Sequence, residues 1–395
     1  MRSLPGAALA LIACVAPLTA LAARHEQANE PASAGAHSAS SALAEERRAP
    51  PVRHVFLIVL ENQSFATTFG RNTPAPYLAQ TLRSQGALLS QYFGIGHSSL
   101  DNYIALVSGQ APNVQTQEDC PIVTEFQLRQ PTLDRDGQAL GVGCMYPALV
   151  RSLPDQLEEA GLAWKGYMED MGNDPAREAT TCGRSPVGAH EKSYVAVAGD
   201  EYVARHDPFI YFHRIVDDRK RCAAHVVNLE RLAKDLQRIE TTPNYSFITP
   251  NLCNDGHDAP CVDGKPGGFE GIDTFLQTWV PRILSSPAYR KDGLLIITFD
   301  ESDSVGADAS SACCGEKPLP GSTQPPGFNG PGGGRIGAVL LSSFIRAGTI
   351  SEVPYNHYSL LRSIEDFFGL GHLGYAGQDG LRTFGADVFN DLTGF

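Results

Sequence analysis

The sequence predicts an α/β sandwich in which helices flank a mostly parallel central β-sheet. Continuous apolar runs rich in β-branched residues occupy Val55–Leu60, Gly293–Phe299 and Ile336–Leu341, and Tyr245–Thr249 is a shorter run of this kind. Runs that are apolar on both faces are typical of strands buried in a parallel sheet. Segments with helical periodicity separate these runs, and strands that alternate with helices build this fold class.

The periodic segments are expected to form the helical layers on the two faces of the sheet. They are Pro76–Ser84, Leu100–Val107, Leu149–Ala160, Ala223–Gln237, Gly271–Val280 and His357–Phe368. Three other stretches have little periodicity and hold several cysteines, namely Gln115–Gly143, Asp170–Asp207 and Ser302–Gly334. Because the chain contains 39 Gly and 27 Pro, we expect these stretches to be long, disulfide-pinned loops that shape a pocket.

The composition restricts the classes of function. The chain has 395 residues, of which 42% are hydrophobic and 19% charged, so its bulk can bury a full core. Its formal net charge is -13, whereas a protein that neutralises many phosphates needs a basic surface. The acidic balance argues against a nucleic-acid partner but not against a small phosphate ester held by a metal ion.

The N-terminal segment predicts export. Residues 1–23 contain an early Arg2, an apolar run over Ala7–Leu21 and small residues at the end. These features indicate a secretory signal peptide and a periplasmic or secreted protein, and the run is shorter than the ~18 apolar residues of a stable membrane span. A lipoprotein signal at Cys14 is the less favoured alternative. Residues 24–52 predict a disordered tether, and residues 53–395 a single domain.

The cysteines predict disulfides. The chain has 9 cysteines, one of which is Cys14 in the leader. An even number in an exported chain indicates disulfides, and the CxxC spacing of a zinc site is missing. Proximity in the sequence favours the pairs Cys120–Cys144, Cys182–Cys222 and Cys253–Cys261, and Cys313 and Cys314 are candidates for a vicinal pair.

Polar side chains follow three of the predicted strands directly. Glu61 and Asn62 follow the first strand, Asp300 and Glu301 follow Gly293–Phe299, and Tyr245–Thr249 leads into Asn251, Asn254, Asp255, His257 and Asp258. A polar turn explains one such ending, but carboxylates that meet at one sheet edge repel each other unless a cation offsets their charge. The pattern therefore favours a divalent metal site, for Mg²⁺, Ca²⁺ or Mn²⁺, or for Zn²⁺ where a histidine joins.

A glycine- and hydroxyl-rich segment precedes the predicted helix Leu100–Val107. It reads Gly94-Ile95-Gly96-His97-Ser98-Ser99. A serine at a helix start is a common N-cap, but the backbone N–H groups and the dipole there also favour an anion. Beside a metal ion Ser99 becomes a candidate nucleophile.

These motifs together resemble the phosphoesterase family of acid phosphatases and phospholipases C, in the alkaline phosphatase superfamily. The matching segments are Glu61–Phe65 with Phe69-Gly70, His97–Tyr103, Asn251–Asp258, Phe299–Glu301 and Asn356–Ser359. The resemblance implies an alkaline-phosphatase-like sandwich and a metal ion held by Glu61, Asn62, Ser99, Asp300 and Glu301. It also implies that Ser99 is transiently phosphorylated and that Asn102 bonds a phosphoryl oxygen. His257 and His357 would contact the phosphate, or a second metal ion together with Asp255.

The chain departs from the family pattern at Ser98 and Asp101, where proline is frequent. An acid beside the anion site weakens phosphate binding unless it points away, so Ser98 stays an alternative nucleophile. His206, in a turn next to Asp207-Pro208, is read as structural, and a place in the pocket lining is the less favoured alternative.

The resemblance implies a secreted, metal-dependent phosphoric ester hydrolase, with acid-phosphatase-type cleavage of monoesters favoured. A phospholipase C-like diesterase, acting on a phospholipid head group, is the alternative within the same chemistry. A secreted binding protein that keeps the fold without activity is the alternative from another class.

Overall fold

An eight-stranded sheet forms the centre of the molecule in the computed structural model, which describes residues 50–306 and 308–390. The strand order is β11-β2-β10-β9-β1-β8-β6-β7. The strands are β1 His54–Leu60, β2 Ala87–Leu89, β6 Trp164–Met168, β7 Val226–Asn228, β8 Tyr245–Thr249, β9 Gly293–Phe299, β10 Ala338–Leu341 and β11 Thr349–Ser351. Two short ladders pair β3 Tyr92–Phe93 with β12 Tyr355–Asn356, and β4 Gln127–Leu128 with β5 Gly141–Val142.

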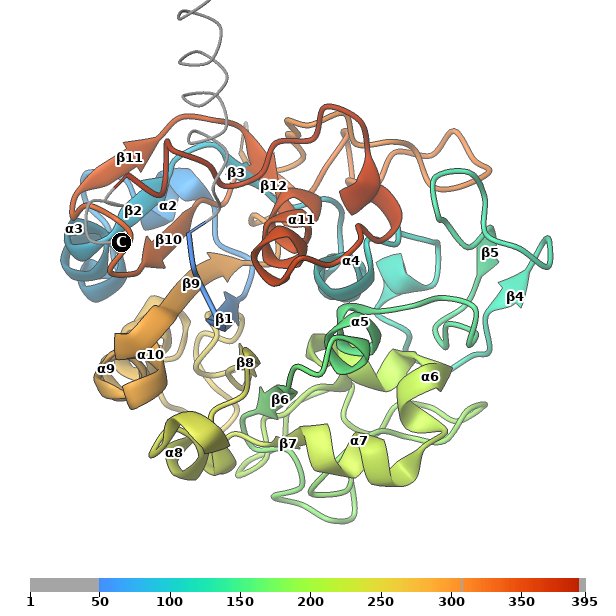
Figure 1. Cartoon of the computed structure of the whole chain (residues 1–395). Helices are drawn as coiled ribbons and strands as arrows, with labels where there is room; N and C mark the ends of the chain where they lie inside the picture. The colour runs from blue at the N-terminus through green and yellow to red at the C-terminus, as the bar shows by residue number, and fades with distance from the viewer. Residues whose placement is uncertain (1–49, 307, 391–395) are drawn as a thin grey trace, which may run out of the picture. The chain divides into compact units, whose positions relative to one another are not determined.

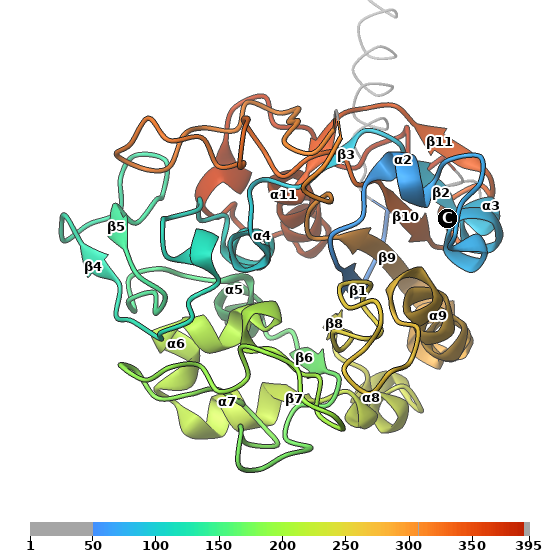
Figure 2. The ribbon, with the colours of Figure 1, turned by 180° about the vertical axis from the view of Figure 1, so that it is seen from behind.

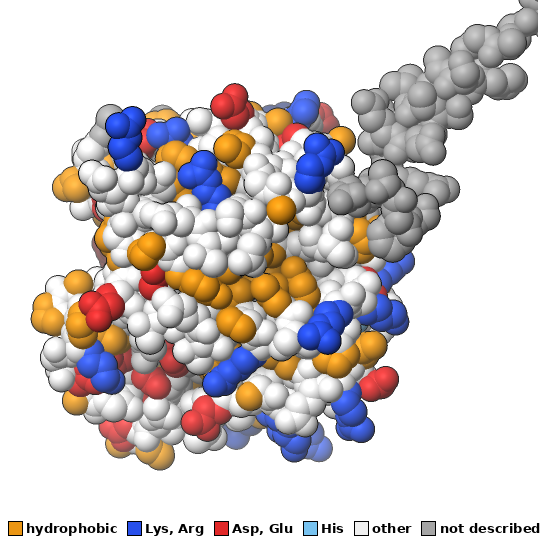
Figure 3. Space-filling view, turned by 90° about the vertical axis from the view of Figure 1, so that its left-hand side faces the viewer, with side chains coloured by type: hydrophobic (Ala, Val, Ile, Leu, Met, Phe, Trp, Pro, Cys, Tyr) orange, Lys and Arg blue, Asp and Glu red, His pale blue; other side chains and the backbone are white. Residues whose placement is uncertain are grey.

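Helices cover both faces of the sheet, as Figures 1 and 2 show. On one side lie α9 Gly268–Ser285 and α10 Pro287–Asp292, and on the other α4 Ser99–Ser108, α5 Leu153–Glu159 and α11 His357–Phe368. The side of α9 presents charged side chains around a band of apolar ones (Figure 3). The shorter helices are α2 Phe65–Thr68, α3 Arg83–Gln85, α6 His213–Val216, α7 Arg219–His225 and α8 Glu230–Asp235.

The central strands carry the core because they are apolar on both faces. Every residue of β1 and β9 is buried, and the two strands run parallel with Leu60 opposite Phe299. β8 pairs with the other edge of β1, also in parallel. The expected α/β sandwich is confirmed, and its three central strands end at the same edge.

Two details of the expected topology are wrong. The run Ile336–Leu341 becomes β10, which pairs antiparallel with both β9 and β2. The predicted helix Ala223–Gln237 is broken into α7, β7 and α8, because Val226 and Val227 extend along β6 as a parallel edge strand. The β-branched pair therefore overrides the helical pattern around it.

Disulfides hold the long loops, as expected. The structure contains the pairs Cys120–Cys144, Cys182–Cys222, Cys253–Cys261 and the vicinal Cys313–Cys314. Within the described part of the chain, no helix combines the length and the apolar composition that a bilayer crossing requires. The predicted signal peptide and almost all of the predicted tether lie outside the described residues.

The sequence separations of the disulfides predict unequal losses of stability. Replacing both members of Cys182–Cys222, which are 40 residues apart, should lower the free energy of unfolding by about 1.4 kcal/mol more than the same change at Cys253–Cys261. The latter pair is 8 residues apart, and a longer closed loop restricts the unfolded chain more. Urea unfolding of the two double Cys→Ser variants measures this difference, and a larger loss for the shorter loop would contradict it.

Candidate active site

The polar residues that follow β1, β8 and β9 meet at one edge of the sheet, as the parallel register requires. The ladder continues past the strand ends, since the backbone N–H of Asp300 donates to the carbonyl of Leu60 over 2.9 Å. The N–H of Glu61 donates to the carbonyl of Asp255, also over 2.9 Å. Glu61, Asp255 and Asp300 are fully buried. The edge therefore gathers three carboxyl groups away from water.

Ser99 begins α4 and reaches into this group of acids. Its hydroxyl donates to Oε2 of Glu61 over 2.9 Å and also contacts Asp300. The Tyr103 hydroxyl, one helical turn further, donates to Oε1 of the same glutamate over 2.6 Å. Both donors lie on one face of α4, so the helix positions Ser99 against the strand that carries Glu61.

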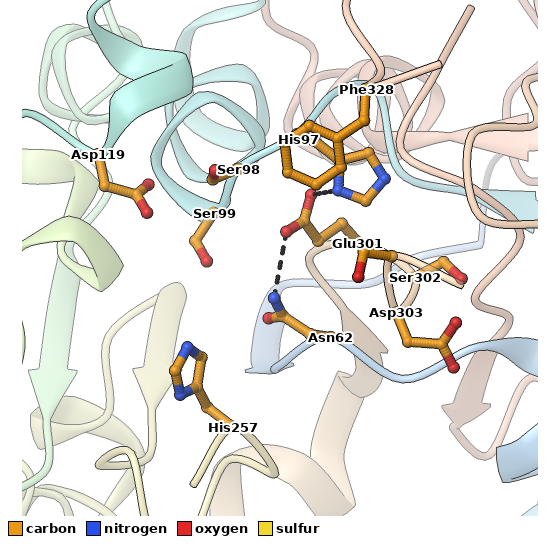
Figure 4. A pocket seen from close by; sticks show the side chains of 11 residues that line it. Asn62, His97, Ser98, Ser99, Asp119, His257, Glu301, Ser302, Asp303 and Phe328 are labelled. Carbon is orange, nitrogen blue, oxygen red and sulfur yellow. Dashed lines mark hydrogen bonds and ion pairs between the residues drawn. The ribbon is translucent and has the colours of Figure 1, made fainter. Parts of the chain in front are cut away.

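Asn62 joins the two acids that follow β9. Its backbone N–H donates to Oδ1 of Asp300 over 3.2 Å, and its side-chain amide donates to Oε1 of Glu301 over 3.1 Å (Figure 4). The φ of Asn62 is 44°, a left-handed conformation that asparagine tolerates better than most residues. The other oxygen of Glu301 pairs with Nδ1 of His97.

The donor set fits a divalent cation. Burial raises the pKa of Glu61 well above its usual range, with a further rise from Asp300, and burial followed by the charge of Asp300 does the same for Glu301. Burial raises the pKa of Asp300 to about 7 despite hydrogen bonds that favour its charged form. Among the described residues, Oδ1 of Asn62 and Oδ2 of Asp300 have no hydrogen-bond partner. Buried oxygen ligands without partners, on acids that resist ionisation, are what a hard cation satisfies.

The two serines at the helix start point to different partners. The Ser98 hydroxyl donates to the carbonyl of Gln117 over 3.2 Å, whereas the Ser99 hydroxyl is directed at the acids. Figure 4 shows Ser99, Asn62 and His257 directed toward a common space. This arrangement favours Ser99 over Ser98 as the nucleophile.

A pocket of about 370 Å³ opens above these residues. Its lining residues come from six separate segments and are Asn62, His97, Ser98, Ser99, Asp119, His257, Glu301, Ser302, Asp303, Ser304 and Phe328. His257 is partly exposed there, and its Nδ1 donates to Asp258 over 2.7 Å. Its Nε2 lies 3.5 Å from the Arg205 guanidinium.

The contacts of Asn102 and His357 in the structure differ from those predicted. Oδ1 of Asn102 accepts from the N–H groups of Ile95 and Gly96, and its amide donates to the carbonyls of Gly96 and Ser98. Asn102 therefore uses these hydrogen bonds to hold the loop before α4. His357 is likewise occupied, since Nε2 donates to the carbonyl of Asp300 and Nδ1 accepts from the Tyr92 hydroxyl.

His206 takes the place expected for His357 beside Asp255. Its Nε2 lies 3.3 Å from Glu61 and its Nδ1 3.3 Å from Asp255, and its ring stacks on Tyr103. Possible ligand atoms of Glu61, His206 and Asp255 lie within 4.8 Å of one another, whereas Asp255, His257 and His357 form no such group in the described chain. Sequence reasoning did not link His206 to these acids, because a lone histidine in a turn before Asp-Pro carries no pattern that connects it to residues distant in sequence.

Comparison with known proteins decides the family. The model of the phosphoesterase family matches residues 74–371. The chain belongs to this family. Its motif residues Ser99, Asp300 and Glu301 fall within the matched range, and Glu61 and Asn62 precede it.

The relatives that the chain matches have low sequence identity to it. The chain is 26% identical over 300 residues to the phosphate-repressible acid phosphatase of Penicillium chrysogenum, covering 74% of this chain and 54% of that protein. It is 26% identical over 330 residues to the phosphatidylinositol-3-phosphatase of Mycobacterium tuberculosis, covering 83% and 80%. The chain spans between 51% and 59% of the length of the fungal acid phosphatases it matches. A solved alkaline phosphatase superfamily protein from Vibrio parahaemolyticus matches 87% of this chain and 73% of that one, with 11% identity and a TM-score of 0.49.

The departures from the family pattern have a structural explanation at the helix start. Asp101 is buried and is not among the residues that line the pocket. Its carboxylate packs against Gly96, where an added Cβ would come within 2.7 Å of it, and burial raises its pKa well above the usual range. Asp119 instead faces the pocket and accepts the N–H of Leu100 over 2.9 Å.

Metal-free protein should lose stability as the pH rises. Glu61, Asp300 and Glu301 have raised pKa values in the folded protein, so the native state binds more protons than the unfolded state above about pH 4. The stability contributed by these protons is present below that pH and is lost as the pH rises through the folded pKa values, which for Asp300 is about 7.

Melting temperatures between about pH 5 and pH 8, measured with chelator and with added Mg²⁺, Ca²⁺, Mn²⁺ or Zn²⁺, test this expectation. The cation should bind the charged acids and should raise the melting temperature more at the higher pH. Asp300→Asn should flatten the pH dependence of the chelated protein. Equal slopes with and without every cation would contradict the proposed ligand set.

Proposed function

We propose that this protein is a secreted, divalent-cation-dependent phosphatase that cleaves phosphate monoesters through a phosphoserine on Ser99. The observation that carries the proposal is the Ser99 hydroxyl, which lines the pocket and lies 2.9 Å from Glu61, within a group of buried acids whose charged forms a cation would stabilise. Membership of the phosphoesterase family supports the reaction class. The names of the fungal and mycobacterial relatives support phosphate monoesters as substrates.

The residues of the chain position the attacking and leaving groups. Glu61, Asn62, Asp300 and Glu301 would hold the cation together with Ser99, and the cation would lower the pKa of the serine hydroxyl and offset phosphoryl charge. The Ser99 hydroxyl gives its proton to Oε2 of Glu61, to which it already donates. Its oxygen attacks phosphorus, the new O–P bond forms, and the ester bond breaks with its electron pair on the leaving oxygen. Asn102 keeps the serine in place by fixing the loop before α4, so it acts as a positioning residue.

His257 is placed to supply the proton that the leaving oxygen needs. It lies in the pocket opposite Ser99 (Figure 4), and the hydrogen bond from its Nδ1 to the Asp258 carboxylate orients the ring. Water then hydrolyses the phosphoserine and releases phosphate. His206, held between Glu61 and Asp255, fixes the orientation of the glutamate beneath the serine.

Replacement of the nucleophile should abolish most turnover. Ser99→Ala removes the attacking oxygen and one cation ligand together, so kcat/KM for a chromogenic phosphate monoester should fall on the order of 10³-fold or more. Ser98→Ala is the matched control and should change the rate far less, because that hydroxyl bonds the Gln117 carbonyl.

Full activity in Ser99→Ala with loss in Ser98→Ala would move the nucleophile by one residue. Diester and choline phospholipid substrates, tested beside the monoester, separate a phosphatase from a phospholipase C-like diesterase. Absence of turnover with all three would favour a binding protein.

Export is part of the same proposal. Residues 1–23 predict a signal peptide, and the eight cysteines of the described chain form four disulfides, a pattern of oxidising compartments. Mass spectrometry of protein recovered outside the cytoplasm should find the leader removed and these cysteines oxidised. Eight free thiols in that material would contradict export in this form.

A further inference from the structure

Phe328 is an exposed aromatic residue at the pocket that contains Ser99. It lines the pocket, yet 56% of its surface is exposed. Large apolar side chains are usually withdrawn from water, and an aromatic residue left open beside polar groups is typical of a ligand contact. The question is whether its position is imposed by the fold.

The turn that carries Phe328 is fixed on both sides. The carbonyl of Pro326 accepts the backbone N–H of His97 over 3.1 Å and the side-chain amide of Gln117 over 2.7 Å. The N–H of Gly327 donates to the carbonyl of Gly330 over 3.1 Å and closes the turn. These bonds tie the turn to the segment that precedes α4, so Phe328 is held at a set distance from the nucleophile.

The ring of Phe328 stacks on His97, with centroids 4.4 Å apart and planes inclined by 14°. His97 is itself immobilised, since Nε2 donates to the carbonyl of Ala309 and Nδ1 pairs with Glu301. The stack covers one face of Phe328, and the exposed fraction belongs to the remainder of the ring. A flat group bound at the phosphate site can therefore lie against that ring.

The charges of the pocket select against a second anion. Asp119 and Asp303 line it beside Glu301, and none of the described residues that line it is Lys or Arg. A cation in the ligand set offsets the charge of one phosphoryl group, and Arg205 lies 3.7 Å from Asp119 and offsets that carboxylate, so a second phosphate on the leaving group would meet the charge of Asp303.

We propose that Phe328 is a specificity-determining residue that selects monoesters with a flat, uncharged aromatic leaving group, which stacks on its ring. This inference rests on the proposed phosphatase activity and names the substrate class for it. Esters with a second phosphate on an alkyl chain are expected to be poor substrates.

The test compares the kcat/KM of phenyl phosphate with that of glycerol phosphate in wild type and in Phe328→Ala. Loss of the stack should lower the aryl-to-alkyl ratio roughly 3- to 10-fold, mainly through KM. Phe328→Tyr keeps an aromatic face and should keep the ratio. Val305→Ala removes another exposed apolar side chain, 71% exposed and outside the pocket lining, and should leave both substrates unchanged.

The outcomes distinguish a failure of this inference from a failure of the proposed phosphatase activity. An active Phe328→Ala enzyme with an unchanged ratio, or with equal losses for both esters, would overturn the role of Phe328 and leave the phosphatase standing. Hydrolysis of an alkyl bisphosphate as fast as phenyl phosphate would also overturn it. A wild type that cleaves no monoester at all would remove the proposed function and this inference together.

Discussion

Mutual repulsion among buried acids is the constraint on which the rest of the site depends. Glu61, Asp255 and Asp300 are fully buried where β1, β8 and β9 end, and the parallel register leaves them no way to separate. Burial opposes their ionisation, so their charged forms need a cation, and Ser99 reaches Glu61 within the same group. The strand register thereby determines where the proposed cation and the proposed nucleophile meet.

The start of α4 depends on further contacts around that edge of the sheet. Asn102 binds four backbone groups of the loop before α4, and His357 binds the carbonyl of Asp300 from the start of α11. Both residues belong to family motifs, yet in this structure they form hydrogen bonds with backbone groups. Motif membership therefore identified residues that matter at the site, whereas only the three-dimensional contacts distinguish those that face the pocket from those that support it.

Sequence alone predicted the parts of the fold with strong local signals. β1 and β9 are continuous apolar runs, and α11 begins and ends as its periodicity indicates. β6 was missed because Lys165 and Gly166 interrupt its apolar character; Lys165 is tolerated there because it pairs with Asp235. The contacts of His206 could not be predicted either, because its partners Glu61 and Asp255 are distant in sequence.

The turn at Gly327–Gly330 belongs to the long connection between β9 and β10, far in sequence from the strand ends that carry Glu61 and Asn62. The same connection begins with Asp300 and Glu301, so the proposed leaving-group contact shares it with two of the proposed cation ligands, whereas Glu61, Asn62 and Ser99 lie elsewhere in the chain. With the proposed role of Phe328, a change confined to this turn alters which leaving groups are accepted and keeps the acids at the sheet edge in place.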